Sequence, residues 1–312
     1  MSAGQPKIQY NQAKLTQADI NRRKYGYVRL KPRKRLNRSF GGSLALFLLL
    51  AFVGAFMIMP ILLMIMNAFK PLDELFYYPP RFFVRNPTFR NFVTLGNLLS
   101  ESWIPFSRYV FNTVFITGIG TVGHVLLASA AAYPLAKHNV PGKKIIFSVI
   151  VLSLMFARDV TMIPNFMIIS ALGINNTYWA IIFPAFAASL GLYLMKQFME
   201  QIPDSIIESA KIDGASEFKI YWSIVMPNVK PAWLTLAILM FQLLWGETGG
   251  LFLRSEELKP LSFSMQQIAM GGIARAGAFS AVSLILFTVP VVFFIFAQSR
   301  IIETMASSGI KE

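Results

Sequence analysis

Six long apolar segments dominate the sequence and are separated by more polar segments. They lie at about residues 42–67, 109–136, 144–166, 177–197, 232–252 and 277–297. A helix of about 20 apolar residues crosses the hydrocarbon core of a bilayer, and each segment is long enough to do so. The pattern therefore predicts an all-α integral membrane protein with six transmembrane helices.

The polar residues at the amino terminus predict the orientation. The first 40 residues contain eleven Lys or Arg and a single acidic residue, Asp19. Basic residues beside a span mark its cytoplasmic side, and they also attract anionic lipid headgroups. We therefore expect a basic cytoplasmic extension at 1–40, a transmembrane domain at 41–299 and a cytoplasmic tail at 300–312, with both termini in the cytoplasm.

The composition agrees with a lipid environment and excludes several kinds of site. Hydrophobic residues make up 55% of the chain and charged residues 14%, with a mean hydropathy of +0.53; a soluble domain has about 25% charged residues. The net charge of +14 is concentrated beside the first span, so we expect contact with lipid and no nucleic-acid partner. The chain has no cysteine and only two histidines, which excludes disulfides, a thiol nucleophile and a Cys- or His-rich metal site. It also lacks the Gly-x-x-x-x-Gly-Lys-Ser/Thr phosphate loop, and we expect no catalytic residue or bound cofactor in this chain.

The segment 203–231, called the coupling loop below, has the local signals of two short helices. Ser205 and Glu208 have the spacing of a capping box, and Gly214 is a typical helix stop. These signals predict a helix at about 205–213 with Ile206, Ile207 and Ala210 on one side. Ser216 is the expected N-cap of a second helix that runs toward Pro227. Such a unit either folds back on its own bundle or presents apolar residues to a partner.

The coupling loop resembles the EAA loop of bacterial ABC import permeases. That motif reads Glu, Ala, Ala, three residues, Gly, nine residues, Ile, one residue, Leu, Pro. Its positions are occupied here, with the spacing kept, by Glu208, Ser209, Ala210, Gly214, Ile224, Met226 and Pro227. The run from Asp213 to Ser216 is similar to the sugar-importing branch of these permeases.

The resemblance extends over almost the whole chain beyond residue 40. Segments similar to the smaller permease of maltose-type importers are Asn67–Glu74, Tyr78–Pro80, Ala131–Ala136, Ile163–Pro164, Leu172–Thr177, Gln197–Phe198 and Gln298–Lys311. The long basic amino terminus departs from the family, and so does Trp245–Glu247, where relatives often read Trp-Asn-Asp.

The resemblance implies the permease subunit of an ABC importer in the bacterial cell membrane, which translocates a carbohydrate or oligosaccharide. It implies as partners a second permease subunit, two copies of an ABC ATPase that bind ATP and magnesium, and an external solute-binding protein. The helix of the EAA loop would sit in a groove of the ATPase and move with it. The residues implied in this coupling are Ser205, Glu208, Ser209, Ala210, Asp213, Gly214, Ala215 and Pro227.

The sequence also allows three other functions. The same architecture could import a different solute such as glycerol phosphate. An intramembrane enzyme would need a catalytic pair, and we find none in suitable spacing. An ion channel or stand-alone carrier would transport without an ATPase.

Polar residues within the apolar segments are candidates for the transport pathway. Arg158 and Asp159 are adjacent in the third segment, where each would cost about 2.5–3.5 kcal/mol at the centre of a lone helix. They either face an aqueous cavity or pair near the outer interface. Further candidates are Asn165, Gln242, Trp245 and Glu247, for which the alternative role is hydrogen bonding between helices.

One glycine pattern has a structural explanation. Gly118, Gly120 and Gly123 match a dinucleotide-binding fingerprint, but they lie within an apolar segment without a preceding strand. We expect them to allow close helix packing, and we expect His124 to be a packing residue too.

Overall fold

The computed structural model describes residues 40–100 and 103–308, with side chains as far as residue 298. Every regular element within these residues is a helix, which confirms the all-α prediction. The predicted basic extension lies outside the described residues except for Phe40, and so do residues 309–312 of the predicted tail. The chain divides into two compact units between Ile58 and Met59.

Helix α2 crosses the boundary between the two units, and the remaining helices belong to the unit that begins at Met59. The helices are α2 (Phe40–Phe69), α3 (Leu72–Leu75), α4 (Arg90–Ser100), α5 (Phe106–Lys137), α6 (Lys143–Ser153), α7 (Arg158–Ala171), α8 (Trp179–Phe186), α9 (Ser189–Glu200), α10 (Asp204–Ile212), α11 (Glu217–Ile220), α12 (Met226–Asn228), α13 (Lys230–Trp245), α14 (Leu261–Met270) and α15 (Ala276–Ser308). A π-helical turn, Tyr221–Val225, joins α11 to α12, and short 3-10 turns lie at Glu256–Leu258 and Gly272–Arg275.

Four helical segments are long and apolar enough to cross a membrane by themselves. They are Phe40–Phe69, Phe106–Lys137, Trp179–Glu200 and Gly272–Gln298, and they correspond to four of the six predicted spans. The other two predicted spans overlap bent pairs of helices, Lys143–Ser153 with Arg158–Ala171 and Glu217–Asn228 with Lys230–Trp245. In the second pair, only Lys230–Trp245 lies within the predicted span 232–252. The described residues therefore contain four to six membrane-spanning elements.

The third predicted span, 144–166, is not one helix. Helix α6 ends at Ser153, α7 begins at Arg158, and the two are inclined by 112°. The residue before α7, Ala157, has an extended backbone, and Asp159 lies in the first turn, where the helix dipole favours a negative charge. The charged pair thus marks the start of a new helix, which corrects its placement within a continuous span.

The fifth predicted span, 232–252, also differs from the structure. Helix α13 ends at Trp245, and the next residues form a loop in which Gly249 and Gly250 have φ angles of +84° and +39°. Glycine adopts this left-handed region without the steric cost that other residues pay. The predicted span ran to residue 252 because Leu251 and Phe252 are apolar, but α13 ends at Trp245.

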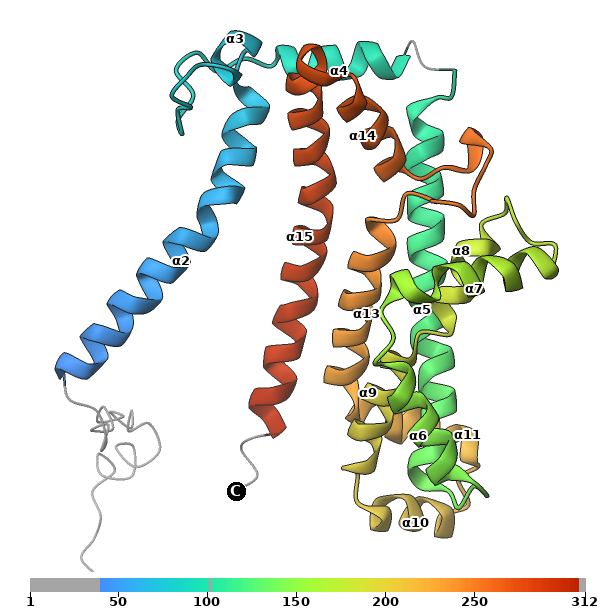
Figure 1. The fold of residues 1–312 in the computed structure, drawn as a ribbon. Coiled ribbons are helices and arrows are strands. Elements are labelled where there is room, and N and C mark those ends of the chain that lie inside the picture. The colour runs from blue at the N-terminus through green and yellow to red at the C-terminus, as the bar shows by residue number, and fades with distance from the viewer. Residues whose placement is uncertain (1–39, 101–102, 309–312) are drawn as a thin grey trace, which may run out of the picture. The chain divides into compact units, whose positions relative to one another are not determined.

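Helix α5 is the centre of the unit that begins at Met59. It packs against α8, α9 and α13, and α13 also packs against α15 (Figure 1). A methyl group at Gly120 would overlap Leu244 of α13, and one at Gly123 would overlap Phe186 of α8. These contacts confirm close packing at two of the three glycines. At Gly118, by contrast, an added methyl group would meet no atom within 4 Å.

His124 of α5 confirms the prediction of a packing residue. Its side chain is fully buried, and its Nδ1 lies 3.3 Å from the carbonyl oxygen of Phe186. Beside it, the backbone of α9 approaches at Gly191, where any side chain would collide with the imidazole. The histidine therefore fills the contact between α5, α8 and α9.

Candidate functional site

Two regions contain the residues that the sequence singled out: the coupling loop and a cavity beside the start of α7. Within the unit that begins at Met59, α10 of the coupling loop and α4 lie at opposite ends (Figure 1).

The first helix of the coupling loop begins differently from the prediction. Helix α10 starts at Asp204 with Pro203 as its N-cap residue, and no side chain caps it, so the predicted capping box between Ser205 and Glu208 is wrong. Instead, the Asp204 carboxylate accepts a bond of 2.7 Å from Nζ of Lys137 at the end of α5. This lysine lowers the pKa of the Asp204 carboxyl, and the pair fixes the start of α10 to the bundle.

The end of α10 agrees with the sequence pattern. Gly214 has a φ of +77°, its N–H donates to the Lys211 carbonyl, and the N–H of Ala215 donates to the Ala210 carbonyl at 3.0 Å. These bonds reverse the chain after the helix in the manner of a glycine C-cap. No heavy atom lies within 4 Å of the position that a side chain would take at Gly214. Its backbone conformation, and not a lack of space, is what requires glycine.

A network of hydrogen bonds and ion pairs connects the second half of the loop to α5. Ser216 is the N-cap of α11, as predicted, and its Oγ accepts a bond from the Lys219 N–H. The next residue, Glu217, pairs with Lys211 at 2.7 Å and accepts a bond of 2.9 Å from the Tyr133 hydroxyl. Lys211 is the main cause that lowers the pKa of Glu217 to about 2. The carboxylate therefore joins α10, α11 and the end of α5.

The apolar residues of α10 face two directions. Ile207 and Ala210 are buried in a cluster with residues of α5, α9 and α13, so this side of the helix folds back on its own bundle. Ile206 was expected on the same side, but 43% of its surface is exposed, and Ile212 is 86% exposed. Phe218 of α11 is 75% exposed. One side of the loop thus anchors it, and the other side presents apolar residues outward.

The remaining residues implied in coupling are mostly on the outer side. The side chains of Ser205, Glu208, Ser209, Asp213 and Pro227 are exposed, and Ala215 is half-buried. The hydroxyl of Ser209 donates to the Ser205 carbonyl at 2.8 Å. Ala210 differs from the others because it is buried, so its contribution is to seat the helix.

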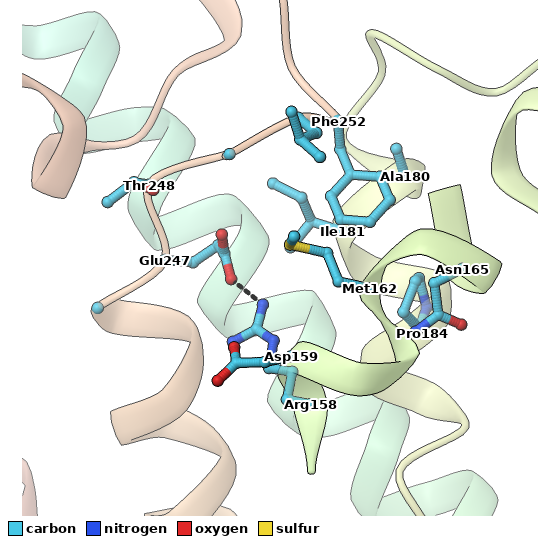
Figure 2. A pocket seen from close by; sticks show the side chains of 13 residues that line it. Arg158, Asp159, Met162, Asn165, Ala180, Ile181, Pro184, Glu247, Thr248 and Phe252 are labelled. Atoms are coloured by element: carbon cyan, nitrogen blue, oxygen red, sulfur yellow. Dashed lines mark hydrogen bonds and ion pairs between the residues drawn. The ribbon is translucent and has the colours of Figure 1, made fainter. Parts of the chain in front are cut away.

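The second region is a cavity of about 350 Å³ that brings together four of the six pathway candidates (Figure 2). Its walls come from the start of α7, from α8 and from the loop after α13. The lining residues are Arg158, Asp159, Met162, Asn165, Ala180, Ile181, Pro184, Gly246, Glu247, Thr248, Gly250, Leu251 and Phe252. Met162, Thr248 and Phe252 line the cavity but were not among the predicted pathway residues. Adjacent glycines, Gly249 and Gly250, were the sequence signal that a loop follows Trp245.

An ion pair between Arg158 and Glu247 spans this cavity (Figure 2). The Glu247 side chain is 9% exposed, and its second oxygen accepts a bond of 3.2 Å from the Gly249 N–H. The Arg158 side chain is 59% exposed. A carboxylate fixed in the loop therefore holds a guanidinium that remains accessible from the cavity.

The other two pathway candidates lie elsewhere. Gln242 and Trp245 line a second cavity of about 670 Å³, bordered by α13, α14, α15 and Met64 of α2, which shares Gly246 and Thr248 with the first. Trp245 is 9% exposed, and its Nε1 donates to the Leu286 carbonyl of α15 at 3.0 Å. Trp245 thus bonds between helices and also lines this cavity, whereas the Gln242 side chain is exposed.

Within residues 40–100 and 103–308, no group of three or more His, Cys, Asp or Glu side chains could hold a metal ion. The polar groups of the first cavity are one guanidinium, two carboxylates, an amide and a hydroxyl. Such a set can bind hydroxyl-rich molecules through hydrogen bonds, because it supplies both donors and acceptors.

Comparison with known proteins gives a match over most of the chain. The sequence profile of the family described as "Binding-protein-dependent transport system inner membrane component" matches residues 35–306. The chain is similar to Protein LplC of Bacillus subtilis (strain 168), with 32% identity over 72% of this chain and 74% of that protein. It is also similar to the polygalacturonan/rhamnogalacturonan transport system permease protein YtcP of the same organism, with 30% identity over 61% of this chain and 73% of that protein.

Among solved structures, a chain of a bacterial ABC transporter involved in the import of the acidic polysaccharide alginate has a similar fold. The TM-score is 0.71 at 20% identity, and the match covers 84% of this chain and 98% of that chain. At this identity the similarity concerns the fold alone.

Proposed function

The chain belongs to the family of binding-protein-dependent transport system inner membrane components, and on this premise we propose that it is the permease subunit of an ABC importer for a carbohydrate or oligosaccharide. The observation that carries the proposal is the family match over residues 35–306. The carbohydrate class is supported by the names of relatives, one of which is a permease for polygalacturonan and rhamnogalacturonan. The fold of an alginate importer chain is consistent with it.

The proposed energy source is a separate ATPase, present in two copies, which binds ATP and magnesium. The outer side of the coupling loop is the surface on which it docks. Glu208, Asp213 and the exposed Ile206 contact the ATPase, while Ile207 and Ala210 transmit its movement because they are embedded in the bundle. ATP drives import only if its binding stabilises one arrangement of the helices more than another.

The proposal includes two further partners. A second permease subunit completes the pathway, and an external solute-binding protein delivers the substrate. The coupling loop and both termini lie in the cytoplasm, so the opposite end of the bundle, near α4, faces the binding protein. The cavity at Arg158 and Glu247 contributes this chain's part of the route.

Reconstitution tests the proposal. The chain would be incorporated into liposomes with its partner permease and ATPase, and uptake of radiolabelled saccharides would be measured with the binding protein outside. We expect saccharide accumulation that requires both ATP and the binding protein. Accumulation of glycerol phosphate but of no saccharide, or equal flux without the ATPase, would overturn it.

A further inference from the structure

The cavity at the start of α7 has an unequal set of charges. One cation, Arg158, and two carboxylates, Asp159 and Glu247, line it, so its formal charge is negative. Its other polar groups, Asn165 and Thr248, are neutral. A molecule in this cavity would therefore meet an overall negative wall.

The cation is already neutralised within the chain. The Glu247 carboxylate is bonded to the Arg158 guanidinium and to the Gly249 N–H, and it is 9% exposed. Withdrawing this carboxylate to free the guanidinium would leave a buried charge without its partner, which is costly. Arg158 can thus donate hydrogen bonds into the cavity, but its positive charge is already compensated by Glu247.

The second carboxylate forms no such pair with any described residue. The Asp159 side chain is exposed, and within the described residues it has no hydrogen-bond or ion-pair partner, although it lines the same cavity. It is a strong acceptor for hydroxyl groups and repels anions. Phe252, Ile181 and Met162 add an apolar wall, which suits the apolar face of a sugar ring.

From this arrangement we infer that the cavity selects neutral saccharides over uronate-containing ones. The inference rests on the proposed function and specifies its substrate class. Arg158 supplies donors to hydroxyl groups, Asp159 supplies acceptors, and Glu247 prevents the guanidinium from recruiting a carboxylate of the substrate.

Equilibrium binding to the assembled transporter in nanodiscs, without the binding protein, tests the inference. The ligands are trisaccharides of galactose and galacturonate with the same linkage, and the equivalent glucose and glucuronate pair. The variants are Asp159→Asn, which removes the free charge, and Glu247→Gln, which releases Arg158. Asp73→Asn in α3 removes one exposed charge that is not part of the cavity lining and is the matched control.

We expect the wild-type transporter to bind the neutral trisaccharide more tightly than the uronate. Each cavity variant should raise affinity for the uronate, relative to the neutral sugar, by about tenfold, because like charges close together in a confined site repel strongly. The ratio should be unchanged in Asp73→Asn. Since Asp159 pairs with no side chain in the part of the chain that the structure describes, Asp159→Asn reports on charge even if Glu247→Gln fails to fold.

Three results would overturn the inference while leaving the import function intact. They are preferential uronate binding by the wild type, an unchanged ratio in Asp159→Asn, and no saccharide binding by a transporter that accumulates saccharide in the reconstituted system. A transporter that neither binds nor accumulates any saccharide would instead refute the proposed function.

Discussion

Replacing Gly214 with alanine perturbs the backbone of the coupling loop without creating a collision. Gly214 has a φ of +77°, and a side chain there would meet nothing within 4 Å. An L-residue in this left-handed conformation costs about 1–2 kcal/mol. The variant can relieve the strain in the free permease by giving up the C-cap bonds of Gly214 and Ala215.

Docking on the ATPase would then have to restore the strained turn. The cost of about 1–2 kcal/mol corresponds to a loss of affinity of about 5- to 30-fold. Ile207 and Ala210 stay buried in the bundle, so the overall fold should be retained. Binding of the purified ATPase to the permease pair in nanodiscs measures the effect, with thermal unfolding as the check on folding.

Gly173→Ala is the matched control for this experiment. Gly173 has a φ of +70° and also has no neighbour within 4 Å, but it lies after α7 and outside the coupling loop. It carries the same strain and should leave ATPase affinity unchanged. Wild-type affinity in Gly214→Ala would refute the reasoning, and an equal loss in both variants would show that general destabilisation is the cause.

Three further predictions concern packing, pH and the outer side of the loop. Gly123→Ala should place a methyl group against Phe186 and lower the free energy of unfolding by about 1–3 kcal/mol, measured by thermal unfolding in detergent; an unchanged midpoint would contradict close packing at this site. Because the pKa of Glu217 is lowered to about 2 from an ordinary 4.5, mainly by Lys211, its stabilising contribution is complete above pH 4.5 and is lost as the pH falls toward 2. Hydrogen exchange of the loop amides, corrected for intrinsic rates, should show this loss, and Glu217→Gln should abolish the dependence. Glu208→Gln should reduce saccharide uptake by about tenfold, as expected when a charged contact to a partner is lost, without changing thermal stability, since this side chain is exposed; normal uptake would exclude a coupling role.

The membrane class and the approximate spans could be predicted from the sequence because local composition determines them. Long apolar segments fixed the membrane class and the approximate spans, because about 20 such residues have few alternatives to a membrane helix. The bend before Arg158 could not be predicted in the same way, since hydropathy reports composition and not the direction of the chain. The adjacent charges at Arg158 and Asp159 were the visible sign of that break.

In the coupling loop, the sequence pattern predicted helix ends correctly where only neighbouring residues determine them. Gly214 and Ser216 act through backbone groups within a few positions, and the structure has both features. The predicted cap at Ser205 was wrong, since α10 begins one residue earlier, at Asp204, which is bonded to Lys137, 67 positions upstream. A local pattern contains no information on such a contact.

The cavity was predictable as a set of residues but not as an arrangement. The cost of charge within apolar segments drew attention to Arg158, Asp159 and Glu247. Their assembly depends on a pairing across 89 positions between Arg158 and Glu247. The hydrogen bond from Trp245 to α15 depends on a residue 41 positions away in the same manner.

The central claim is that the outer side of α10 is the contact through which a separate ATPase drives the permease. The chain has no cysteine, so a single Ser209→Cys substitution allows selective cross-linking to the ATPase in the assembled transporter, with Ser255→Cys as the control on the loop before α14. We predict a cross-link from position 209 but not from 255, accompanied by loss of ATP-driven saccharide uptake that returns on reduction. Absence of the 209 cross-link from an assembled transporter with full uptake would contradict the account.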